Sequence, residues 1–259
     1  MILDYKGIPV FYSDTGKGQV VVLLHGFLED SSMWDTLTPV LAQRNRVITI
    51  DLLGHGKTAC LGYIHTMEDM ANAVYFVLKT LKLRKYIFIG HSMGGYVALA
   101  FAKKHSESIK GLCLLNSTYQ EDSIERKQLR ARANKMVQNN YENMVRMSFA
   151  NLFSAESKLK YNEAYNEALK TALKTPIQGY MSANEGMRLR EDSSTFFTEA
   201  SFKKIVLLGK KDTILDVENI LKFTKKHNIE SYVFSEGHMS HIENKIDFIK
   251  QIMLFVEKI

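Results

Sequence analysis

Residues 85–105 read KYIFIGHSMGGYVALAFAKKH and join two different patterns. The first five residues are rich in β-branched and aromatic side chains, which predicts a short buried strand. Residues 93–104 are mostly apolar, as expected for a helix that packs against a sheet. Between them lies GHSMGG, which contains Gly-x-Ser-x-Gly. We therefore predict a strand, a sharp turn and a helix, with Ser92 in the turn.

The two glycines that flank Ser92 favour a chemical role for this serine. Gly90 and Gly94 lie two residues before and after it, where side chains would collide if the strand and helix approached closely. Such an approach would hold Ser92 in a strained conformation. A simple glycine-rich turn does not explain this symmetric placement. We predict that Ser92 is a nucleophile.

The rest of the chain alternates between short apolar strands and helical segments, so we predict an α/β protein. Further strands are expected at residues 8–14, 19–24, 46–50, 110–115, 204–209 and 230–234. Helices are expected at residues 33–43, 67–81, 93–104, 217–227 and 241–258. Apolar strands separated by helices predict a mostly parallel central sheet with helices on both faces. A hairpin-like pair that ends at residues 15–18 would form an antiparallel edge.

The alternation stops between residues 119 and 192, where the sequence is helical in character and has no convincing strand. This segment follows a strand end, so an insertion here would project over the carboxyl edge of the sheet, where α/β proteins bind ligands. Pro176 marks an expected helix start. We predict an α/β core of residues 1–118 and 193–259 and a helical cap, or lid, of residues 119–192.

Composition excludes several classes of protein. The net charge is +6, but basic and acidic residues are interspersed, so no nucleic-acid partner is expected. The amino-terminal residues contain no apolar run long enough for a signal peptide or a membrane span. Cys60 and Cys113 form no disulfide framework, which favours a cytoplasmic protein. The eight histidines match no metal-binding spacing, so we expect no metal and no cofactor.

A nucleophilic serine needs a base within hydrogen-bond reach and an acid that orients the base. Asp212 follows the strand at 204–209, and His238 follows the strand at 230–234. Gly237 permits an unusual backbone angle just before His238. His241 is the alternative base, but we expect it in the first turn of the last helix, as a surface or supporting histidine. We predict Asp212 as the acid and His238 as the base.

Acyl transfer places negative charge on the former carbonyl oxygen, and backbone N–H groups commonly receive it. One donor should be Met93, the residue after the nucleophile. The other should come from His25-Gly26-Phe27, which follows the strand at 19–24, and we choose the Phe27 N–H.

Taken together, these motifs resemble those of the α/β-hydrolase fold superfamily, in its branch with a helical cap. HGF at 25–27, DLLGHGKT at 51–58, GHSMGG at 90–95, GKKD at 209–212 and GHMSHIEN at 237–244 stand in the family's order over nearly the whole chain. The resemblance implies a triad of Ser92, Asp212 and His238. In some members the acid follows an earlier strand, where this chain has Asn116 with Glu121 and Asp122 nearby, but Asp212 fits the spacing better. Similar epoxide hydrolases and haloalkane dehalogenases carry aspartate in place of the serine, which disfavours those activities.

The resemblance implies hydrolysis of a carboxylic ester of small to medium size, that is, a carboxylesterase. The same triad also serves C–C hydrolases, enol-lactonases, a lyase-like synthase of menaquinone biosynthesis and acyl transferases, and these stay open. A third alternative is a ligand-binding hydrolase fold without catalysis. The expected pocket residues lie in the cap: Met144, Phe149, Phe153, Tyr180 and Met187.

One charged segment bears on partners. Five basic residues lie between Arg126 and Lys135, in a helical segment without an acidic residue, and Arg126 and Arg130 are one turn apart. We predict that this face docks an acidic carrier protein or a phosphate-bearing substrate. The alternative is an ordinary solvated helix face.

Overall fold

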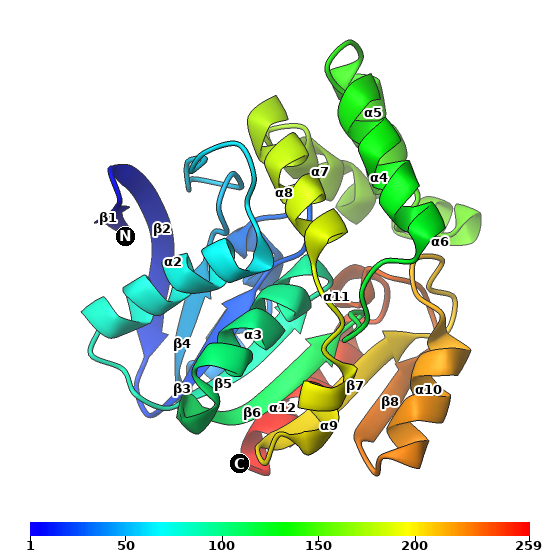
Figure 1. Cartoon of the computed structure of the whole chain (residues 1–259). Helices are drawn as coiled ribbons and strands as arrows, with labels where there is room; N and C mark the ends of the chain where they lie inside the picture. Colours follow the sequence, from blue (N-terminus) through cyan, green and yellow to red (C-terminus); the bar gives the residue numbers. More distant parts are fainter.

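The computed structural model describes all 259 residues and contains one eight-stranded sheet of order β1-β2-β4-β3-β5-β6-β7-β8 (Figure 1). The strands are β1 (Ile2–Tyr5), β2 (Ile8–Gly16), β3 (Gln19–Leu24), β4 (Asn45–Ile50), β5 (Tyr86–His91), β6 (Ile109–Leu115), β7 (Lys203–Gly209) and β8 (Glu230–Phe234). The strands from β4 to β8 pair in parallel, whereas β1 and β2 form an antiparallel edge. The predicted α/β class and mostly parallel sheet are confirmed.

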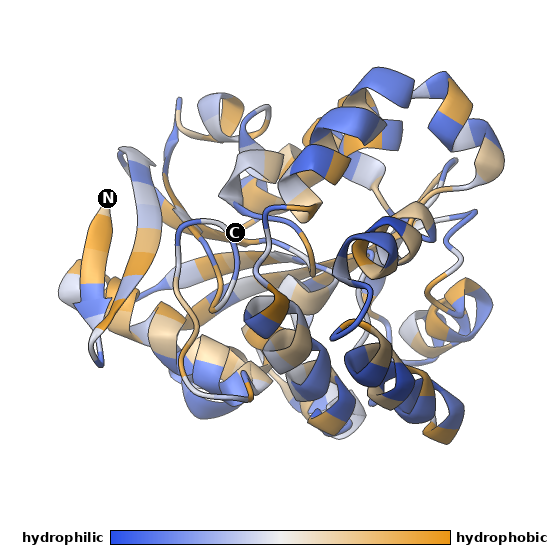
Figure 2. Cartoon of the chain, turned by 90° about the horizontal axis from the view of Figure 1, so that it is seen from above, coloured by the Kyte–Doolittle hydropathy of each residue, from blue (hydrophilic) through white to orange (hydrophobic).

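Both faces of the sheet are buried because successive strand residues point to opposite sides. On β3, Val22 and Leu24 join one hydrophobic cluster, and Val21 and Leu23 join another. The first cluster includes residues of α2 (Met67–Thr80), α3 (Met93–Lys104), α9 (Ser194–Glu199) and α10 (Val217–Lys226). The second includes residues of α1 (Thr38–Leu41) and α12 (Lys245–Glu257). In Figure 2 the helices carry both hydrophobic and hydrophilic residues, as expected for elements with one buried face.

Two segments that we predicted as single helices are each divided into two elements, so these predictions were wrong. Residues 33–43 form a 3₁₀ turn, η1 (Ser31–Trp34), and the separate short helix α1. Pro39 has no N–H and occupies the first turn of α1, so a new helix begins there. Residues 241–258 are divided between α11 (Ser240–Glu243) and α12 by Asn244, whose side chain bonds Glu236 N and Ser235 Oγ.

Between β6 and β7 the chain forms helices only. Apart from α9, which joins a cluster on the sheet, they are α4 (Ile124–Met136), α5 (Tyr141–Ala150), α6 (Ala155–Lys160), α7 (Asn162–Ala172) and α8 (Ile177–Leu189), and these five lie beyond the carboxyl ends of the strands (Figure 1). Pro176 is the N-cap of α8. A separate hydrophobic cluster joins these helices to Leu28 and Met239 of the loops below. The division into a core and a cap as folding units stays a prediction.

The helices of the molecule are all too short or too polar to cross a lipid bilayer.

Candidate functional site

Ser92 lies in a strained turn between β5 and α3. Its backbone has φ 48° and ψ −114°, which a non-glycine residue rarely adopts. A Cβ atom on Gly90 would come within 2.4 Å of Gly94 O, and one on Gly94 within 2.2 Å of Leu24 O. Only glycine permits this close approach of β5, α3 and β3, as the sequence predicted.

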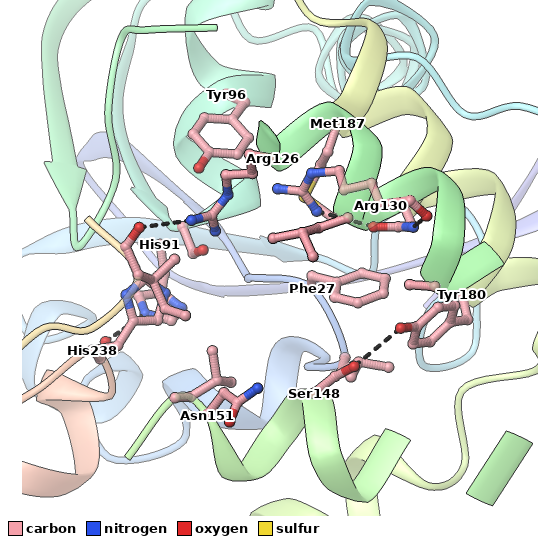
Figure 3. A pocket seen from close by; sticks show the side chains of 17 residues that line it. Phe27, His91, Tyr96, Arg126, Arg130, Ser148, Asn151, Tyr180, Met187 and His238 are labelled. Carbon is pink, nitrogen blue, oxygen red and sulfur yellow. Dashed lines mark hydrogen bonds between the residues drawn. The ribbon is translucent and has the colours of Figure 1, made fainter. Parts of the chain in front are cut away.

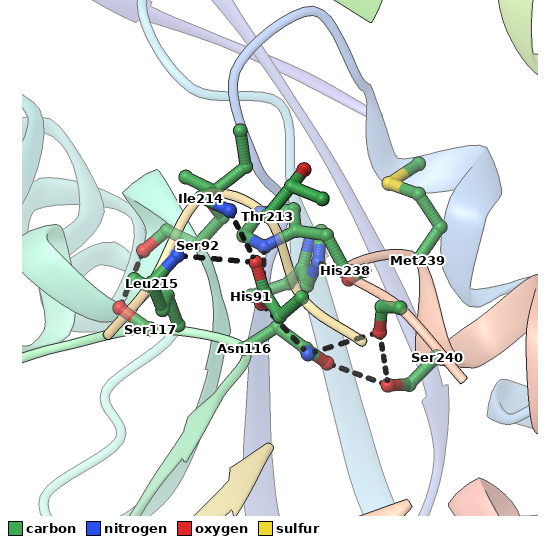
Figure 4. A network of polar contacts seen from close by, with 12 residues as sticks. His91, Ser92, Asn116, Ser117, Thr213, Ile214, Leu215, His238, Met239 and Ser240 are labelled. Carbon is green, nitrogen blue, oxygen red and sulfur yellow. Dashed lines mark hydrogen bonds and ion pairs between the residues drawn. The ribbon is translucent and has the colours of Figure 1, made fainter. Parts of the chain in front are cut away.

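His238 and Asp212 are brought together from the loops after β8 and β7. His238 Nδ1 lies 2.7 Å from Asp212 Oδ2, and both side chains are buried. Asp212 Oδ1 accepts hydrogen bonds from Ile214 N at 2.7 Å and Leu215 N at 3.2 Å. Figure 4 shows this network around His238. The backbone of the loop after β7 therefore holds the Asp212 carboxylate in place independently of His238.

These contacts keep Asp212 ionised. Burial acts to raise the pKa of the Asp212 carboxyl, but attraction to His238 and hydrogen bonds from His238, Ile214 N and Asn116 outweigh burial, so the pKa is lowered. An ionised Asp212 accepts from Nδ1–H, which leaves the lone pair of His238 on Nε2.

Asn116 is a supporting residue that the sequence reasoning did not assign. It follows β6 with φ 42°, and its Nδ2 donates to Asp212 Oδ2 at 3.2 Å and to Gly237 O at 3.3 Å. Its Oδ1 accepts from Ser240 Oγ at 2.7 Å. The position that we weighed as an alternative for the acid thus holds an amide that positions Asp212. An asparagine directly after a central strand, next to β7 in the sheet, is the signal that could have identified it.

Ser92 and His238 line the same cavity, but no hydrogen bond joins Ser92 Oγ to His238 Nε2. Nε2 is buried and has no hydrogen-bond partner. Hydrogen bonds between a nucleophile and its base are often long without substrate and tighten in the complex. The open lone pair of the imidazole is therefore the group available to take a proton in this cavity.

The two backbone N–H groups expected to bind an oxyanion, those of Phe27 and Met93, are free to donate. Phe27 N makes no hydrogen bond within the chain. Met93 is the first residue of α3, and the N–H groups of a first helical turn have no partner inside the helix. Gly26 N, next to Phe27, donates to Glu29 Oε2 at 2.7 Å, which fixes the loop.

A second buried pair of histidine and carboxylate lies beside the first. His91 Nδ1 is 2.6 Å from Glu29 Oε2, and His91 Nε2 is 3.1 Å from the backbone oxygen of His238. Both partners are acceptors, so both nitrogens of His91 donate and the ring is an imidazolium. Burial acts to lower the pKa of His91, but the charge of Glu29, the hydrogen bonds to Glu29 and the His238 backbone and the charge of Asp212 together outweigh burial, so the pKa is raised. Burial likewise acts to raise the pKa of Glu29, but attraction to His91 and the hydrogen bond with it, with smaller attractions to His241 and His25, lower that pKa to about 2.

His241 is buried rather than on the surface, so that part of our prediction was wrong. It lies on α11 with Nε2 3.6 Å from Glu29 Oε1, and burial lowers its pKa to about 4. The contact with Glu29 explains why this position is enclosed. His241 makes no hydrogen bond to Asp212 and does not line the cavity that holds Ser92.

The cavity above Ser92 has a volume of about 290 Å³ and lies between the strand ends and the α4–α8 helices (Figure 3). Tyr180 and Met187 line it, as expected. Met144, Phe149 and Phe153 do not, and this part of the prediction was wrong. Their side chains pack within the helical insertion, where Phe149 and Phe153 contact Tyr165 of α7.

The cavity wall from the insertion is more polar than we predicted. On α4 the lining residues are Arg126, Leu129, Arg130 and Ala133, and on α8 they are Tyr180, Asn184 and Met187. Both sets follow the spacing of one helix face. Arg132 and Lys135 are exposed instead, so the basic residues of α4 do not form one docking face. The periodicity of polar residues, rather than aromatic content, is the signal that could have identified this wall.

No group of three or more His, Cys, Asp or Glu side chains in the chain is arranged to hold a metal ion.

Comparison with known proteins places this geometry in a family. Solved structures include a thermophilic esterase from Thermogutta terrifontis with malate bound, which is 30% identical and superposes with a TM-score of 0.91 over 99% of this chain and 96% of that chain. The 2-hydroxy-6-oxo-6-(2'-aminophenyl)hexa-2,4-dienoic acid hydrolase of Metapseudomonas resinovorans is 27% identical over 97% of this chain and 89% of its own length. The 3-oxoadipate enol-lactonase 1 of Acinetobacter baylyi is 25% identical over 98% of this chain and 94% of its own length.

The family model described as alpha/beta hydrolase fold matches residues 19–245. The chain belongs to the α/β-hydrolase fold family.

Proposed function

We propose that this hydrolase cleaves a carboxylic ester through an acyl-enzyme intermediate. Ser92 is the nucleophile, His238 the general base and Asp212 the group that orients it. One observation carries the proposal: a strained Ser92 shares a cavity with a histidine whose Nδ1 is bonded to a buried carboxylate and whose Nε2 is open.

In this mechanism Ser92 Oγ attacks the ester carbonyl carbon while its proton passes to His238 Nε2. Asp212 stabilises the resulting imidazolium, and the N–H groups of Phe27 and Met93 donate to the oxyanion. Collapse of the intermediate breaks the bond to the alkoxy oxygen, which leaves with the proton from His238. Water then attacks the acyl-enzyme by the same steps, which releases the acid and restores Ser92.

A second candidate uses the same triad on another bond. The relatives that cover almost the whole chain include a C–C bond hydrolase and an enol-lactonase by name. We place ester cleavage first because the thermophilic esterase is the more similar at 30% identity. An acyl transferase, a lyase and a protein that only binds a ligand remain alternatives that the experiment below separates.

Residues 119–192 act in this proposal as a cap that closes the substrate cavity. We propose a cytoplasmic location, since Cys60 and Cys113 are both free thiols. An acidic carrier protein at residues 126–135 has less support, because Arg126 and Arg130 face the cavity rather than a shared outer surface.

The test is covalent labelling with a fluorophosphonate, followed by peptide mass spectrometry. We expect stoichiometric modification of Ser92 in the natural chain and loss of modification in His238→Ala. Turnover of a simple ester in ¹⁸O-water should then place the label in the acid product. A folded protein that is not modified contradicts the hydrolase, and modification of Ser92 with no label in the product indicates transfer or elimination.

A further inference from the structure

Three arginines surround one buried carboxylate at the edge of the cavity. Asp122, whose side chain is fully buried, pairs with Arg126, Arg130 and Arg190. Three positive charges against one negative charge leave an excess of two in this cluster, and two of its arginines, Arg126 and Arg130, line the cavity. Burial acts to lower the pKa of Arg130; Asp122 opposes this, and the charges of Arg126 and Arg190 add to it.

Two of these guanidinium groups keep an unused donor. Arg126 Nη1 donates to Ile214 O at 2.8 Å, and Arg130 Nη1 donates to Asn184 Oδ1 at 3.0 Å, while both Nε atoms face Asp122. The Nη2 atom of each makes no hydrogen bond within the chain. Figure 3 shows both arginines at the cavity, with Arg126 on the side of His238, and Ser92 lines the same cavity.

No negatively charged side chain lines the cavity to balance this positive charge. The 17 lining residues include Arg126 and Arg130 but no aspartate or glutamate. Asp122 is shared among the three arginines, and the carboxylates of the neighbouring loops have histidine partners, since Asp212 bonds His238 and Glu29 bonds His91. A partly enclosed cation with free donors is stabilised when an anion enters and accepts from it.

We infer that Arg126 and Arg130 bind a carboxylate carried by the substrate, so that the natural ester also bears a free acid group. This rests on the proposed hydrolase and names its substrate class: a half-ester of a small dicarboxylic acid, or an ester of a small hydroxy acid. A cavity of about 290 Å³ suits only a short chain between the two groups. The two free Nη2 donors match the two oxygens of a carboxylate.

A phosphoryl group would fit this wall less well. It presents three acceptor oxygens and more charge than a carboxylate. No lysine lines the cavity, and the first turn of α4 is capped by Ser123. The cavity thus offers two free Nη2 donors, whereas a phosphoryl group presents three acceptor oxygens.

Matched substrates test the inference. Monomethyl glutarate places a carboxylate on the acyl side, and methyl 5-methylhexanoate replaces that carboxylate with an isopropyl group. Acetoxyacetic acid places the carboxylate on the alcohol side, and isobutyl acetate is its neutral counterpart. We expect the natural chain to have the higher kcat/KM for the charged ester of one pair, and that pair identifies the side on which the acid group lies.

Arg126→Met is the decisive variant, because Arg126 is the more exposed of the two arginines at 37% against 12% and its removal leaves Arg130 and Arg190 with Asp122. We expect the ratio of kcat/KM for the charged ester to that for its neutral counterpart to fall roughly 10- to 100-fold, the usual effect of a hydrogen bond to a charged group. Arg126→Lys should recover part of the ratio. Arg132→Met is the matched control, since Arg132 is exposed on the same helix, and it should leave the ratio unchanged.

Labelling of Ser92 by the fluorophosphonate separates the two levels of failure. A variant that is labelled at the natural rate is folded and has its triad intact. If the natural chain is labelled but prefers the neutral ester in both pairs, or if Arg126→Met leaves both ratios unchanged, the carboxylate site is wrong and the hydrolase stands. If the natural chain is neither labelled nor active on any of the four esters, the proposed function itself fails.

Discussion

Two buried pairs of histidine and carboxylate lie next to each other in this molecule, and they differ in one nitrogen atom. The rings of His238 and His91 are 5.2 Å apart between centroids, and each has its Nδ1 on a carboxylate, at 2.7 Å from Asp212 and 2.6 Å from Glu29. The Nε2 of His91 donates to the backbone oxygen of His238, whereas the Nε2 of His238 has no partner.

The different environment of the two Nε2 atoms gives the two pairs different roles. A histidine with both nitrogens donating is a fixed cation, and it has no lone pair with which to accept a proton. His91 therefore holds the backbone of His238 and, through Glu29, the loop that carries Phe27. His238 keeps one lone pair and faces the cavity, so it alone can serve as a base. Both pairs join a buried histidine to a buried carboxylate, and the second hydrogen bond of the histidine decides the role.

We call His238 with Asp212 the open pair, because His238 Nε2 has no partner, and His91 with Glu29 the closed pair. The largest expected effect comes from changing the carboxylate of the open pair, Asp212, to its amide. Asp212→Asn keeps the shape of the side chain but presents an N–H or a neutral oxygen to His238, so the imidazole loses its orienting acceptor and the stabilisation of its charged form. We expect kcat on a neutral ester to fall on the order of ten-thousand-fold, with the free energy of unfolding measured in parallel.

Glu29→Gln is the matched change in the closed pair. Because Glu29 acts only through the position of the Gly26–Phe27 loop and of His91, we expect kcat to fall by about tenfold or less. Equal losses in the two variants would contradict the division of roles, and a larger loss in Glu29→Gln would make His91 the better candidate for the base.

The closed pair should instead be visible in the dependence of stability on pH. The folded pKa of His91 is raised above 6.5, so its contribution is complete below about 6.5 and is lost as the pH rises through the folded pKa. The folded pKa of Glu29 is about 2 against an ordinary 4.5, so its contribution is present above about 4.5 and is lost as the pH falls toward 2.

We expect the pair to stabilise the fold most between about pH 4.5 and 6.5. The measurement is the free energy of unfolding of the natural chain minus that of Glu29→Gln/His91→Gln, from denaturant titrations. Above pH 6.5 this difference should decline by at most about 1.4 kcal/mol per pH unit, the limit for one proton. His55 and His241 titrate in both proteins, so the subtraction removes most of their contribution. A difference that is constant with pH would mean that His91 is not charged.

The sequence predicted the framework of the site better than its surroundings. The strained turn at Ser92 and the order of β7, Asp212, β8 and His238 depend on local patterns, such as glycine spacing and loops after strands, that can be read along the chain. Glu29 could not be assigned in this way, since its partner His91 lies 62 residues away, and the place of Asn116 after a strand did not by itself identify Asp212, 96 residues away, as its partner. The helical insertion is the extreme case, because hydrophobic content alone does not say whether Phe149 faces the cavity or Tyr165.

The smallest expected effect concerns His241, which the sequence analysis kept as the alternative to His238 for the base. Its Nε2 lies 3.6 Å from Glu29 Oε1, it does not line the cavity, and burial lowers its pKa to about 4, so it is neutral at the pH of activity. His241→Gln replaces one buried polar side chain with another of similar reach and leaves Asp212 and His238 untouched. We expect kcat on a neutral ester to change by about threefold or less and the pH profile to keep its shape. A variant that folds and is labelled at less than about one hundredth of the natural rate would assign the base to His241, and the open nitrogen of His238 would then need another explanation.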